Sequence, residues 1–449
     1  MNMNRTTSSI SPAQPYSAFA SQVKYAVACI LENGSIDSAI TEKLLNGAAA
    51  EALVSYVSNE LRAADGIYFT GHELSKYVAS CIADRLQNGA SIADPTCGAG
   101  DLLLACAATF GLGSDLLHTI RAWEKRIVAC DLHDSFVEAT KARLMLLAAK
   151  SHSSGKGSKN VSMSSEAPFD QVQMGDYFNN IERISQVDCV VMNPPFVSVS
   201  SPSDCKWAKG NVQLAGVILD CVITNAKDGQ EIVAVLPDVL RSGTRYARWR
   251  KYISSQAEIK NISLYGRFDK NTDVDVFVIH LIKNNAANIS LCGDWSNFAG
   301  HCLSDPETIL MESVFRVSVG AYVPFRAKVA GKKVPYLCVS HAIPDGETEI
   351  DEKCIFDGTL HQTPFVVIRR TSNPSDPRRV IPSLITSPLQ VAVENHLIVL
   401  SPIDGKLSTC KKLMKSLLRP EVDEWMNNAI RCRHLTTSVV KKLPLVDWL

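Results

Sequence analysis

The sequence predicts a doubly wound α/β sheet, with a small helical cap before it and a mainly β domain after it. Three observations predict this fold class. Apolar runs of strand type alternate with helical apolar spacing from about residue 66 to residue 298. Residues 1–65 show helical spacing alone, and beyond residue 299 the segments are short, β-like and punctuated by Pro and Gly. We therefore expect domains at residues 1–65, 66–298 and 299–449.

The composition sets limits on partners and location. The chain carries 46 basic and 46 acidic residues in 449, so no global field attracts a polyanion, and nucleic-acid binding needs a local patch. The 14 cysteines are scattered without a C-x-x-C pair, which is typical of reduced thiols and predicts no metal site. The N-terminal residues lack the apolar core of a signal peptide, and no apolar run reaches membrane length. We expect a cytoplasmic protein without membrane contact.

The first stretches of the chain predict a helical cap and then a turn. Apolar residues recur at helical spacing through Ala18–Arg62, which predicts two or three packed helices. Gly66–Leu74 reads GIYFTGHEL and leads into a further helical pattern. Thr70 is expected to cap that helix, with Glu73 completing a capping box. Alternatively, the same turn covers a cofactor.

A strand, a glycine-containing turn and a helix follow in order. Ser91–Gly100 reads SIADPTCGAG, and a helix is expected over Asp101–Phe110. Glycines 98 and 100 allow close backbone approach, and the helix N-terminus favours a carboxylate or phosphate. Leu103 stands where a dinucleotide-binding turn has its third glycine, so a nicotinamide cofactor is disfavoured.

Two further acidic residues are expected at the same sheet edge. Asp131 ends the strand Ile127–Asp131, where it can accept hydrogen bonds from a ribose diol or cap the following helix. Asp170–Phe178 ends in Gly-Asp-Tyr-Phe. Asp176 is placed to accept from an adenine amine, and Tyr177 to stack on that ring.

The stretch Asp188–Phe196, DCVVMNPPF, predicts a buried strand that ends in a rigid turn. The side-chain oxygen of Asn193 and the carbonyl of Pro194 are two acceptors held close together, which suits the two hydrogens of an aromatic amine. Phe196 offers a flat face on which a base can stack. An ordinary strand-ending turn with a core Phe is the alternative.

The rest of the chain completes the sheet and adds basic clusters. A helix is expected over Asn211–Ala226, a strand over Glu231–Leu236, and an antiparallel pair at Asn261–Leu264 and Val274–Ile282. Short strands are expected beyond the sheet, at Tyr322–Arg326, Tyr336–Val339, Phe365–Ile368 and Leu397–Leu400. Phosphate contact is expected from a cluster of four arginines, Arg369, Arg370, Arg378 and Arg379.

In this order, YFTG, DPTCGAG, IVACD, GDYF, NPPF, VLPDVL and VDVFVIHLI resemble the N6-adenine DNA methyltransferases of restriction–modification systems. The resemblance covers about Gly66 to Lys283 and is closest to the members with cofactor motifs first and a target-recognition domain last. It implies a Rossmann-like methyltransferase sheet, double-stranded DNA as substrate and S-adenosylmethionine as cofactor. The family usually has Pro where this chain has Gly71, which loosens the assignment of that turn.

The resemblance also implies a role for each motif residue. The catalytic turn would be Asn193, Pro194, Pro195 and Phe196, with Phe268 stacking on the other face of a flipped base. The cofactor would contact Tyr68, Phe69, Thr70, Asp94, Pro95, Cys97, Gly98, Gly100, Asp131, Asp176 and Tyr177. Neither a metal nor a general base is required by this chemistry.

Partners and alternatives follow from the same resemblance. A cognate restriction endonuclease is the implied partner, and one alternative is a modification subunit that needs a separate specificity protein. Methyltransferases acting on rRNA guanine or protein glutamine share the Asn-Pro-Pro turn, but normally lack the YFTG turn and a basic β-rich tail. A catalytically silent DNA-binding protein is the alternative from another class, and the intact turn at Asn193–Phe196 argues against it.

Overall fold

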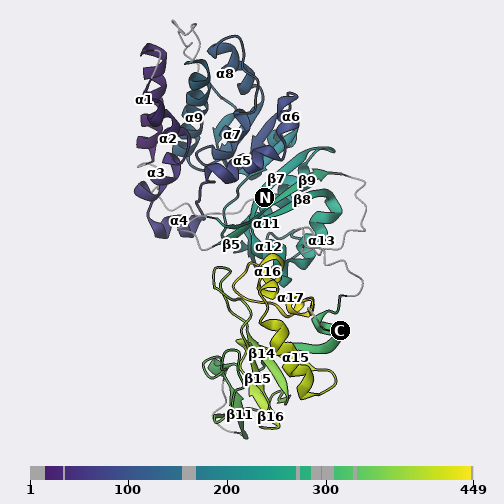
Figure 1. The fold of residues 1–449 in the computed structure, drawn as a ribbon. Coiled ribbons are helices and arrows are strands. Elements are labelled where there is room, and N and C mark those ends of the chain that lie inside the picture. The colour runs from purple at the N-terminus through teal and green to yellow at the C-terminus, as the bar shows by residue number, and fades with distance from the viewer. Residues whose placement is uncertain are drawn as a thin grey trace. The chain divides into compact units, whose positions relative to one another are not determined.

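The computed structural model describes residues 16–33, 36–153, 168–268, 274–284, 295, 308–326, 331–445 and 448 (Figure 1). The chain divides into two compact units. Unit 1 comprises Met1–Leu240 and Arg248–Gly293, and unit 2 comprises Arg241–Ala247 and Asp294–Leu449. The predicted boundary at residue 298 lies outside the described residues.

Unit 1 is built on a seven-stranded sheet with the order β3-β2-β1-β4-β7-β9-β8. Its strands are β1 (Ile92–Asp94), β2 (Ile127–Asp131), β3 (Val172–Met174), β4 (Cys189–Met192), β7 (Glu231–Pro237), β8 (Ala257–Arg267) and β9 (Asp275–Lys283). Five neighbouring strands are parallel, and β9 runs antiparallel between β7 and β8. The chain reverses its direction of winding between β1 and β4, which makes this the switch point of the sheet. The predicted doubly wound, Rossmann-like sheet is confirmed.

Alternate residues of the strands face opposite layers of helices. On β4, Cys189 and Val191 join the core cluster that also contains α1, α5, α7 and α9, whereas Val190 points to the other face. Figure 1 shows α11 and α13 on that other face. All four β4 residues are buried, as expected for a strand covered on both sides.

The helices of unit 1 lie before, between and after the strands. Those preceding the sheet are α1 (Ser17–Asn33), α2 (Ser38–Leu45), α3 (Ala48–Tyr56) and α4 (Asn59–Asp65), and α1 packs along α9. Those within the sheet region are α5 (His72–Ser80), α6 (Ala83–Gln87), α7 (Asp101–Ala107), α8 (Leu116–Glu124), α9 (Asp134–Ser153), α10 (Tyr177–Ser185), α11 (Leu214–Asn225), α12 (Asp238–Ser242) and α13 (Ala247–Gln256). The four helices of residues 17–65 form the predicted helical N-terminal region.

Two local predictions in unit 1 are wrong. Gly71, not Thr70, is the N-cap of α5, so the predicted capping box does not form. Residues Asn211–Gln213 form strand β6, which pairs with β5 (Ser198–Ser200), and the helix therefore begins only at Leu214. In both cases a partner distant along the chain competes with the local helix signal.

Unit 2 contains two four-stranded sheets and a helical C-terminal segment. One sheet has the order β10 (Phe315–Val319), β17 (Leu397–Pro402), β14 (Phe365–Arg369), β15 (Pro382–Ile385). The other has the order β12 (Lys353–Ile355), β11 (Lys333–Leu337), β16 (Gln390–Val393), β13 (His361–Gln362). The predicted strand at Tyr322–Arg326 is wrong, because its end forms a short 3-10 helix, Pro324–Arg326. The remaining helices are α14 (Met311–Val314), α15 (Leu407–Leu417), α16 (Pro420–Ala429) and α17 (Thr437–Lys441).

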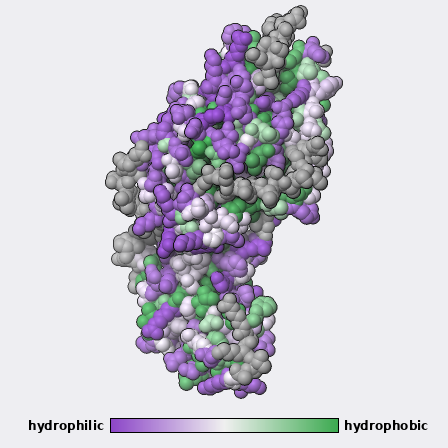
Figure 2. Space-filling model, turned by 180° about the vertical axis from the view of Figure 1, so that it is seen from behind, coloured by the Kyte–Doolittle hydropathy of each residue, from purple (hydrophilic) through white to green (hydrophobic). Residues whose placement is uncertain are grey.

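The surface of the described residues is mostly polar. Figure 2 shows hydrophilic side chains over much of the visible face, with apolar side chains in scattered patches. Among the described residues, no helix is both long enough and apolar enough to cross a bilayer.

Candidate active site

The carboxyl ends of β1, β2 and β4 bring the predicted motifs of unit 1 to one edge of the sheet. Asp94 ends β1 and Asp131 ends β2, and these strands pair in parallel register. Asn193 follows β4, which pairs with β1 on its other side. The two acidic residues and the carboxamide thus lie at the switch point, where open α/β sheets bind their ligands.

Asn193 is held by the turn that precedes α5. Its amide nitrogen Nδ2 donates to the Thr70 hydroxyl at 2.9 Å and to the Tyr68 carbonyl at 3.3 Å. Its oxygen Oδ1 is buried and has no hydrogen-bond partner among the described residues. A reversed carboxamide would place its oxygen against the Tyr68 carbonyl, which can only accept, so this contact favours the orientation in which the Asn193 nitrogen donates here.

The Pro194 carbonyl provides a second available acceptor. Within the described ranges no donor bonds to it, and Pro194 is itself buried. The predicted pair of acceptors at Asn193 and Pro194 therefore has no partner in the part of the chain that the structure describes. Buried acceptors without partners are uncommon, because leaving one unsatisfied costs about 1–3 kcal/mol.

Gly66 fixes the distance between the two turns. It ends α4 with φ +65°, and a Cβ built there would lie 2.8 Å from Val197 Cγ1 and 2.9 Å from the Phe196 nitrogen. Only glycine combines that left-handed backbone with so close a contact. The segment bearing Thr70 is thereby packed directly on the turn bearing Asn193.

The loop after β1 is organised around a buried carboxyl group. Asp94 is 1% exposed, and its Oδ1 accepts from the Thr96 nitrogen at 3.0 Å. Burial raises the pKa of Asp94 to about 8, against its ordinary value of 3.8. The hydroxyl of Thr96 is buried without a partner in the described chain. Thr96 is a candidate site residue that the sequence analysis missed, although it stands between the predicted Pro95 and Cys97.

The two glycines of this loop are required by protein packing. Gly98 has φ +51°, and its Cβ position lies 2.8 Å from a ring carbon of Phe69. Gly100 has φ +87°, and its Cβ position lies 2.8 Å from the Thr140 methyl group. Phe69 itself packs against Tyr16, so its ring supports the loop from within the core. The sequence analysis expected these glycines to let the backbone approach a ligand closely. In the structure the atoms that approach them are the side chains of Phe69 and Thr140.

Asp131 connects the loops after β1 and β2. Its carboxylate accepts from the Gly98 nitrogen at 2.9 Å and from the His133 nitrogen at 3.0 Å. Burial raises the pKa of Asp131, and the nearby His133 and the two backbone donors oppose that rise. A carboxylate offers about four lone pairs, so Asp131 retains capacity for further donors.

An apolar side chain beside Asp131 was not predicted as part of the site. Leu132 is 48% exposed, which is unusual for a leucine directly after a buried strand. The sequence signal was its position after Asp131. An exposed leucine next to a strand-end carboxylate can cover the face of a flat heterocycle.

The predicted residues after β3 lie at the N-terminus of α10. Asp176 is its N-cap, and its Oδ1 accepts from the Phe178 nitrogen at 2.9 Å. Tyr177 is 7% exposed, and its ring centroid lies 3.8 Å from that of Phe178. Gly175 donates to the Asp131 carbonyl at 2.8 Å, which places this segment beside the loop after β2. The cofactor contacts assigned to Asp176 and Tyr177 stay a prediction.

Three aromatic rings meet beside the Asn193 turn. Phe196 and Phe268 have centroids 5.6 Å apart and planes at 84°, and Tyr68 lies 6.3 Å from Phe268. Phe268 thus lies beside Phe196, and its stacking on a flipped base stays a prediction. The two phenylalanine rings meet edge to face, so a base can enter between them only if one ring turns.

A fully buried arginine ties the N-terminal helices to this site. The Arg143 guanidinium donates to the carbonyls of Leu44, Leu45 and Ala99 at 3.1, 2.7 and 2.6 Å. It also forms an ion pair with Asp101 at 2.7 Å, at the start of α7. The charge is therefore compensated in the interior, and α2 and the loop after β1 share one anchor.

The four arginines predicted to contact phosphate differ in exposure. The Arg379 side chain is fully buried and donates to Ser372 Oγ, Asn427 Oδ1 and the carbonyls of Ile430 and Cys432. That geometry gives Arg379 a packing role and keeps it from surface phosphates. Arg378 forms an ion pair with Asp345 at 2.6 Å. Arg369 and Arg370 are half-buried at the end of β14, and phosphate contact by them stays a prediction.

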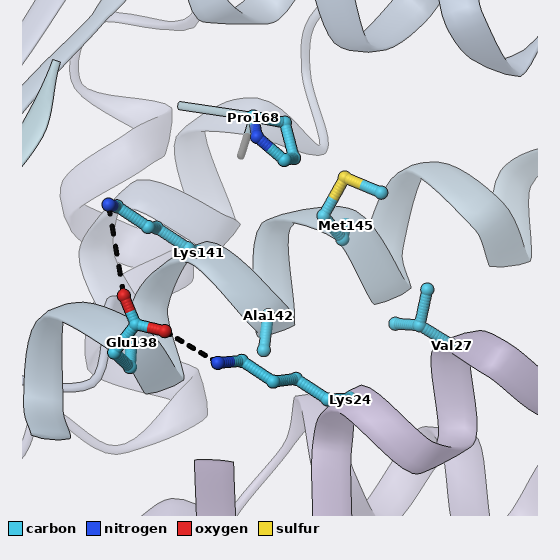
Figure 3. A pocket seen from close by; sticks show the side chains of 7 residues that line it. All are labelled: Lys24, Val27, Glu138, Lys141, Ala142, Met145 and Pro168. Atoms are coloured by element: carbon cyan, nitrogen blue, oxygen red, sulfur yellow. Dashed lines mark hydrogen bonds and ion pairs between the residues drawn. The ribbon is translucent and has the colours of Figure 1, made fainter. Parts of the chain in front are cut away.

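A separate cleft of about 210 Å³ lies between α1 and α9 (Figure 3). Glu138 at its rim is paired with Lys24 and Lys141, and the floor is apolar. None of the predicted site residues lines it; the lining is Lys24, Val27, Glu138, Lys141, Ala142, Met145 and Pro168. The cleft therefore belongs to the helix packing of unit 1.

Comparison with solved structures finds restriction–modification proteins at different degrees of similarity. The type IIL restriction-modification enzyme MmeI in complex with DNA matches with a TM-score of 0.55 at 11% identity, over 88% of this chain and 70% of that one. The type IIG restriction endonuclease BpuSI matches with a TM-score of 0.46 at 14% identity, over 99% and 71%. The type I restriction enzyme EcoKI M protein matches with a TM-score of 0.37 at 12% identity, over 62% and 59%. At these identities the MmeI match supports the fold alone.

Comparison of sequences gives the family. No curated protein matches the chain. The family model described as N-6 DNA Methylase matches residues 42–295 of 449, which includes α3 to α13 and every motif of the sheet edge. This match confirms the resemblance drawn from the ordered motifs. More than half of the sequence is matched, and the chain therefore belongs to the N-6 DNA methylase family.

Proposed function

We propose that this chain is a site-specific DNA methyltransferase that moves a methyl group from S-adenosylmethionine to N6 of a flipped adenine, as the modification enzyme of a restriction–modification system. One observation carries the proposal: the Asn193 oxygen is buried, unpartnered and fixed in orientation by Thr70 and Tyr68. Family membership supports DNA methylation, and the switch-point position supports a ligand site there.

The residues at the loop edge fit S-adenosylmethionine. The buried Asp94 carboxyl lacks a cationic partner among the described residues, and an ammonium group would stabilise its ionised form. Asp131 has lone pairs left for a ribose diol, and Leu132 offers an exposed apolar face to an adenine ring. When bound, the cofactor supplies an electrophilic methyl group on a sulfonium.

The acceptor pair acts on the target amine. The Asn193 oxygen and the Pro194 carbonyl would accept the two amine hydrogens, which draws the nitrogen lone pair out of the ring and toward the methyl group. Thr70 and Tyr68 accept the amide hydrogens of Asn193 and so keep them away from the target amine. The amine also donates, so it could not form a hydrogen bond with those hydrogens. The proton leaves after transfer has made it acidic, so the chain needs no general base.

Capture of the base explains the neighbouring rings. An adenine inside a duplex cannot present N6 in line with a methyl donor, so the base must leave the stack at a cost of a few kcal/mol. Stacking on an aromatic face is worth about 1–3 kcal/mol per base, and Phe196 offers such a face next to Asn193. Phe268 would take the second face after rotation from its edge-on contact.

The test is methyl transfer from labelled S-adenosylmethionine to DNA, with the modified base and its flanks identified. Asn193→Ala should lower kcat by about 10²–10³, the usual loss for one acceptor or donor in a preorganised site, with cofactor Kd nearly unchanged. Asn225→Ala removes an exposed asparagine of α11 and should retain full activity. Unchanged turnover in Asn193→Ala, or loss of cofactor binding alone, contradicts the proposal.

A second measurement follows the base itself. Phe196→Ala should weaken capture of the flipped base, seen as reduced 2-aminopurine fluorescence at the target position. Fluorescence equal to that of the unchanged protein would remove Phe196 from the base pocket.

A further inference from the structure

A tight turn in unit 2 brings a thiol and an imidazole together. Cys338 directly follows β11, and the His341 nitrogen donates to its carbonyl at 3.3 Å, which closes a four-residue turn. Their spacing is Cys-x-x-His. Both side chains are accessible: Cys338 is half-buried and the His341 side chain is 44% exposed.

The neighbouring strand adds a carboxylate to the same place. The Tyr336 nitrogen donates to the Glu352 carbonyl at 2.9 Å, one step beyond the β11–β12 pair of Pro335 and Lys353. Residues paired across a ladder share a face, and so do residues two apart on one strand. Glu352 and Cys338 therefore lie on one side of the hairpin. His341 Nδ1 lies 3.3 Å from a Glu352 oxygen.

We propose that Cys338, His341 and Glu352 bind a divalent, borderline-soft cation of the Zn²⁺ type, with water completing a tetrahedral shell. One ligand atom from each residue lies within 4.8 Å of the other two. Metal–ligand bonds of about 2.0–2.3 Å place tetrahedral ligands roughly 3.3–3.8 Å apart, a spacing that imidazole and carboxylate already have. The Cys338 thiol lies 3.0 Å from the Ser340 hydroxyl oxygen, and it would have to leave that contact to reach the bond length of a metal ligand.

The site would clamp the long loop between β11 and β12. The segment between Cys338 and Glu352 carries Asp345, which pairs with Arg378 at 2.6 Å. A bound cation at its base would restrict the loop in the folded chain, where the ligands are brought together, and would so couple metal binding to folding. The competing account is a plain His341–Glu352 ion pair, which requires a protonated imidazole and does not involve the thiol.

The experiment titrates Co²⁺ into the reduced full-length chain and records thiolate-to-cobalt charge-transfer absorption, followed by displacement with Zn²⁺. The unchanged protein should bind one equivalent with that band, and Cys338→Ser should lose it. Cys354→Ser is the matched control, because this half-buried free thiol lies on β12 outside the ligand group. It should retain both the stoichiometry and the band.

The other two ligands are tested through affinity. His341→Ala and Glu352→Gln should each weaken Zn²⁺ binding by about tenfold or more, since even outer-shell changes cost a metal site about 10–100-fold. Circular dichroism of each variant checks that the fold is kept. The proposal is overturned if the unchanged protein binds no stoichiometric Co²⁺, if the band survives in Cys338→Ser, or if neither substitution weakens binding.

Discussion

The amide nitrogen of Asn193 lies 2.9 Å from the hydroxyl oxygen of Thr70, across 123 residues of sequence. Thr70 is 4% exposed, and Asn193 follows a strand that is buried along its whole length. The contact between them therefore lies in the interior of unit 1. The hydrogen bond joins the turn before α5 to the turn after β4 and holds the Asn193 amide nitrogen, while the Asn193 oxygen is buried without a partner among the described residues. This contact makes the two turns one functional unit.

The first prediction concerns that hydrogen bond. Thr70→Val removes the acceptor while keeping the shape, and we expect kcat for methyl transfer to fall about 3- to 10-fold, the equivalent of a net 0.5–1.5 kcal/mol. Thr70→Ser keeps a hydroxyl and should restore most of the rate. Cofactor Kd, measured by calorimetry on both variants, tests separately the cofactor contact that the family resemblance implies for Thr70. A Thr70→Ser variant as slow as Thr70→Val would show that the hydroxyl is not the cause.

The second prediction concerns the pH dependence of stability through Asp94. In the folded, ligand-free chain its pKa is raised to about 8, whereas in the unfolded chain it ionises near 3.8. The unfolded state therefore releases this proton first, and the group's contribution to stability is lost as pH rises from about 4 to about 8. Asp94→Asn should raise Tm relative to the unchanged protein, increasingly so up to pH 8, while weakening cofactor binding.

Its control is Asp170→Asn, which changes an exposed carboxylate. Thermal melts across this pH range should show no growing difference for that variant. An Asp94→Asn protein that loses Tm as pH rises would mean that the carboxyl is ionised and compensated in the free protein.

The third prediction concerns Gly66. A left-handed backbone costs a non-glycine residue about 1–2 kcal/mol, and the added Cβ would press on Val197 and the Phe196 nitrogen. Gly66→Ala should therefore lower the free energy of unfolding and also reduce kcat. Gly89 also has a positive φ, +94°, but no atom lies within 4 Å of its Cβ position. Gly89→Ala is therefore the control that introduces backbone strain without a steric contact. If Gly66→Ala and Gly89→Ala lowered kcat equally, the loss at Gly66 would not come from its contact with the turn that bears Asn193.

The fourth prediction distinguishes two arginines of unit 2. Arg379→Ala should lower Tm strongly, because it leaves the Asn427 side chain and the carbonyls of Ile430 and Cys432 without their donor. Arg369→Ala should leave Tm unchanged, weaken DNA binding and reduce the slope of log K against log salt by about 1. A flat salt response in the unchanged protein would remove Arg369 from the proposed DNA contact.

The sheet could be predicted from the sequence because its strands have clear signals in their own local sequence. Cys189–Met192 is a continuous apolar run that ends at Asn-Pro-Pro, and both features follow from burial on two faces and from the proline ring. The motif order then identified the family. The predicted antiparallel pair is confirmed as β8 and β9, and strand pairing adds the position of β9 between β7 and β8.

What escaped prediction depends on contacts between distant segments. The spacing from Thr70 to Glu73 resembles a capping box. In the structure the Thr70 hydroxyl accepts from Asn193 instead, and Gly71 is the N-cap of α5. Arg379 looks the same in sequence as its neighbour Arg378, yet one is enclosed by α16 and the other reaches the surface. The domain expected to be mainly β also contains the amphipathic helix Leu407–Leu417, which the sequence analysis did not predict.

The buried guanidinium of Arg143 bears on how the protein can be shortened or recombined. Its donors are shared between the end of α2 and the loop after β1, so a chain trimmed to begin at Gly66 would lose two acceptors of this guanidinium and uncover the side of α9 on which α1 and α2 pack. A shortened or chimeric protein that contains the sheet of unit 1 should therefore also contain the N-terminal helices, because the carbonyls of α2 share Arg143 with the loop after β1.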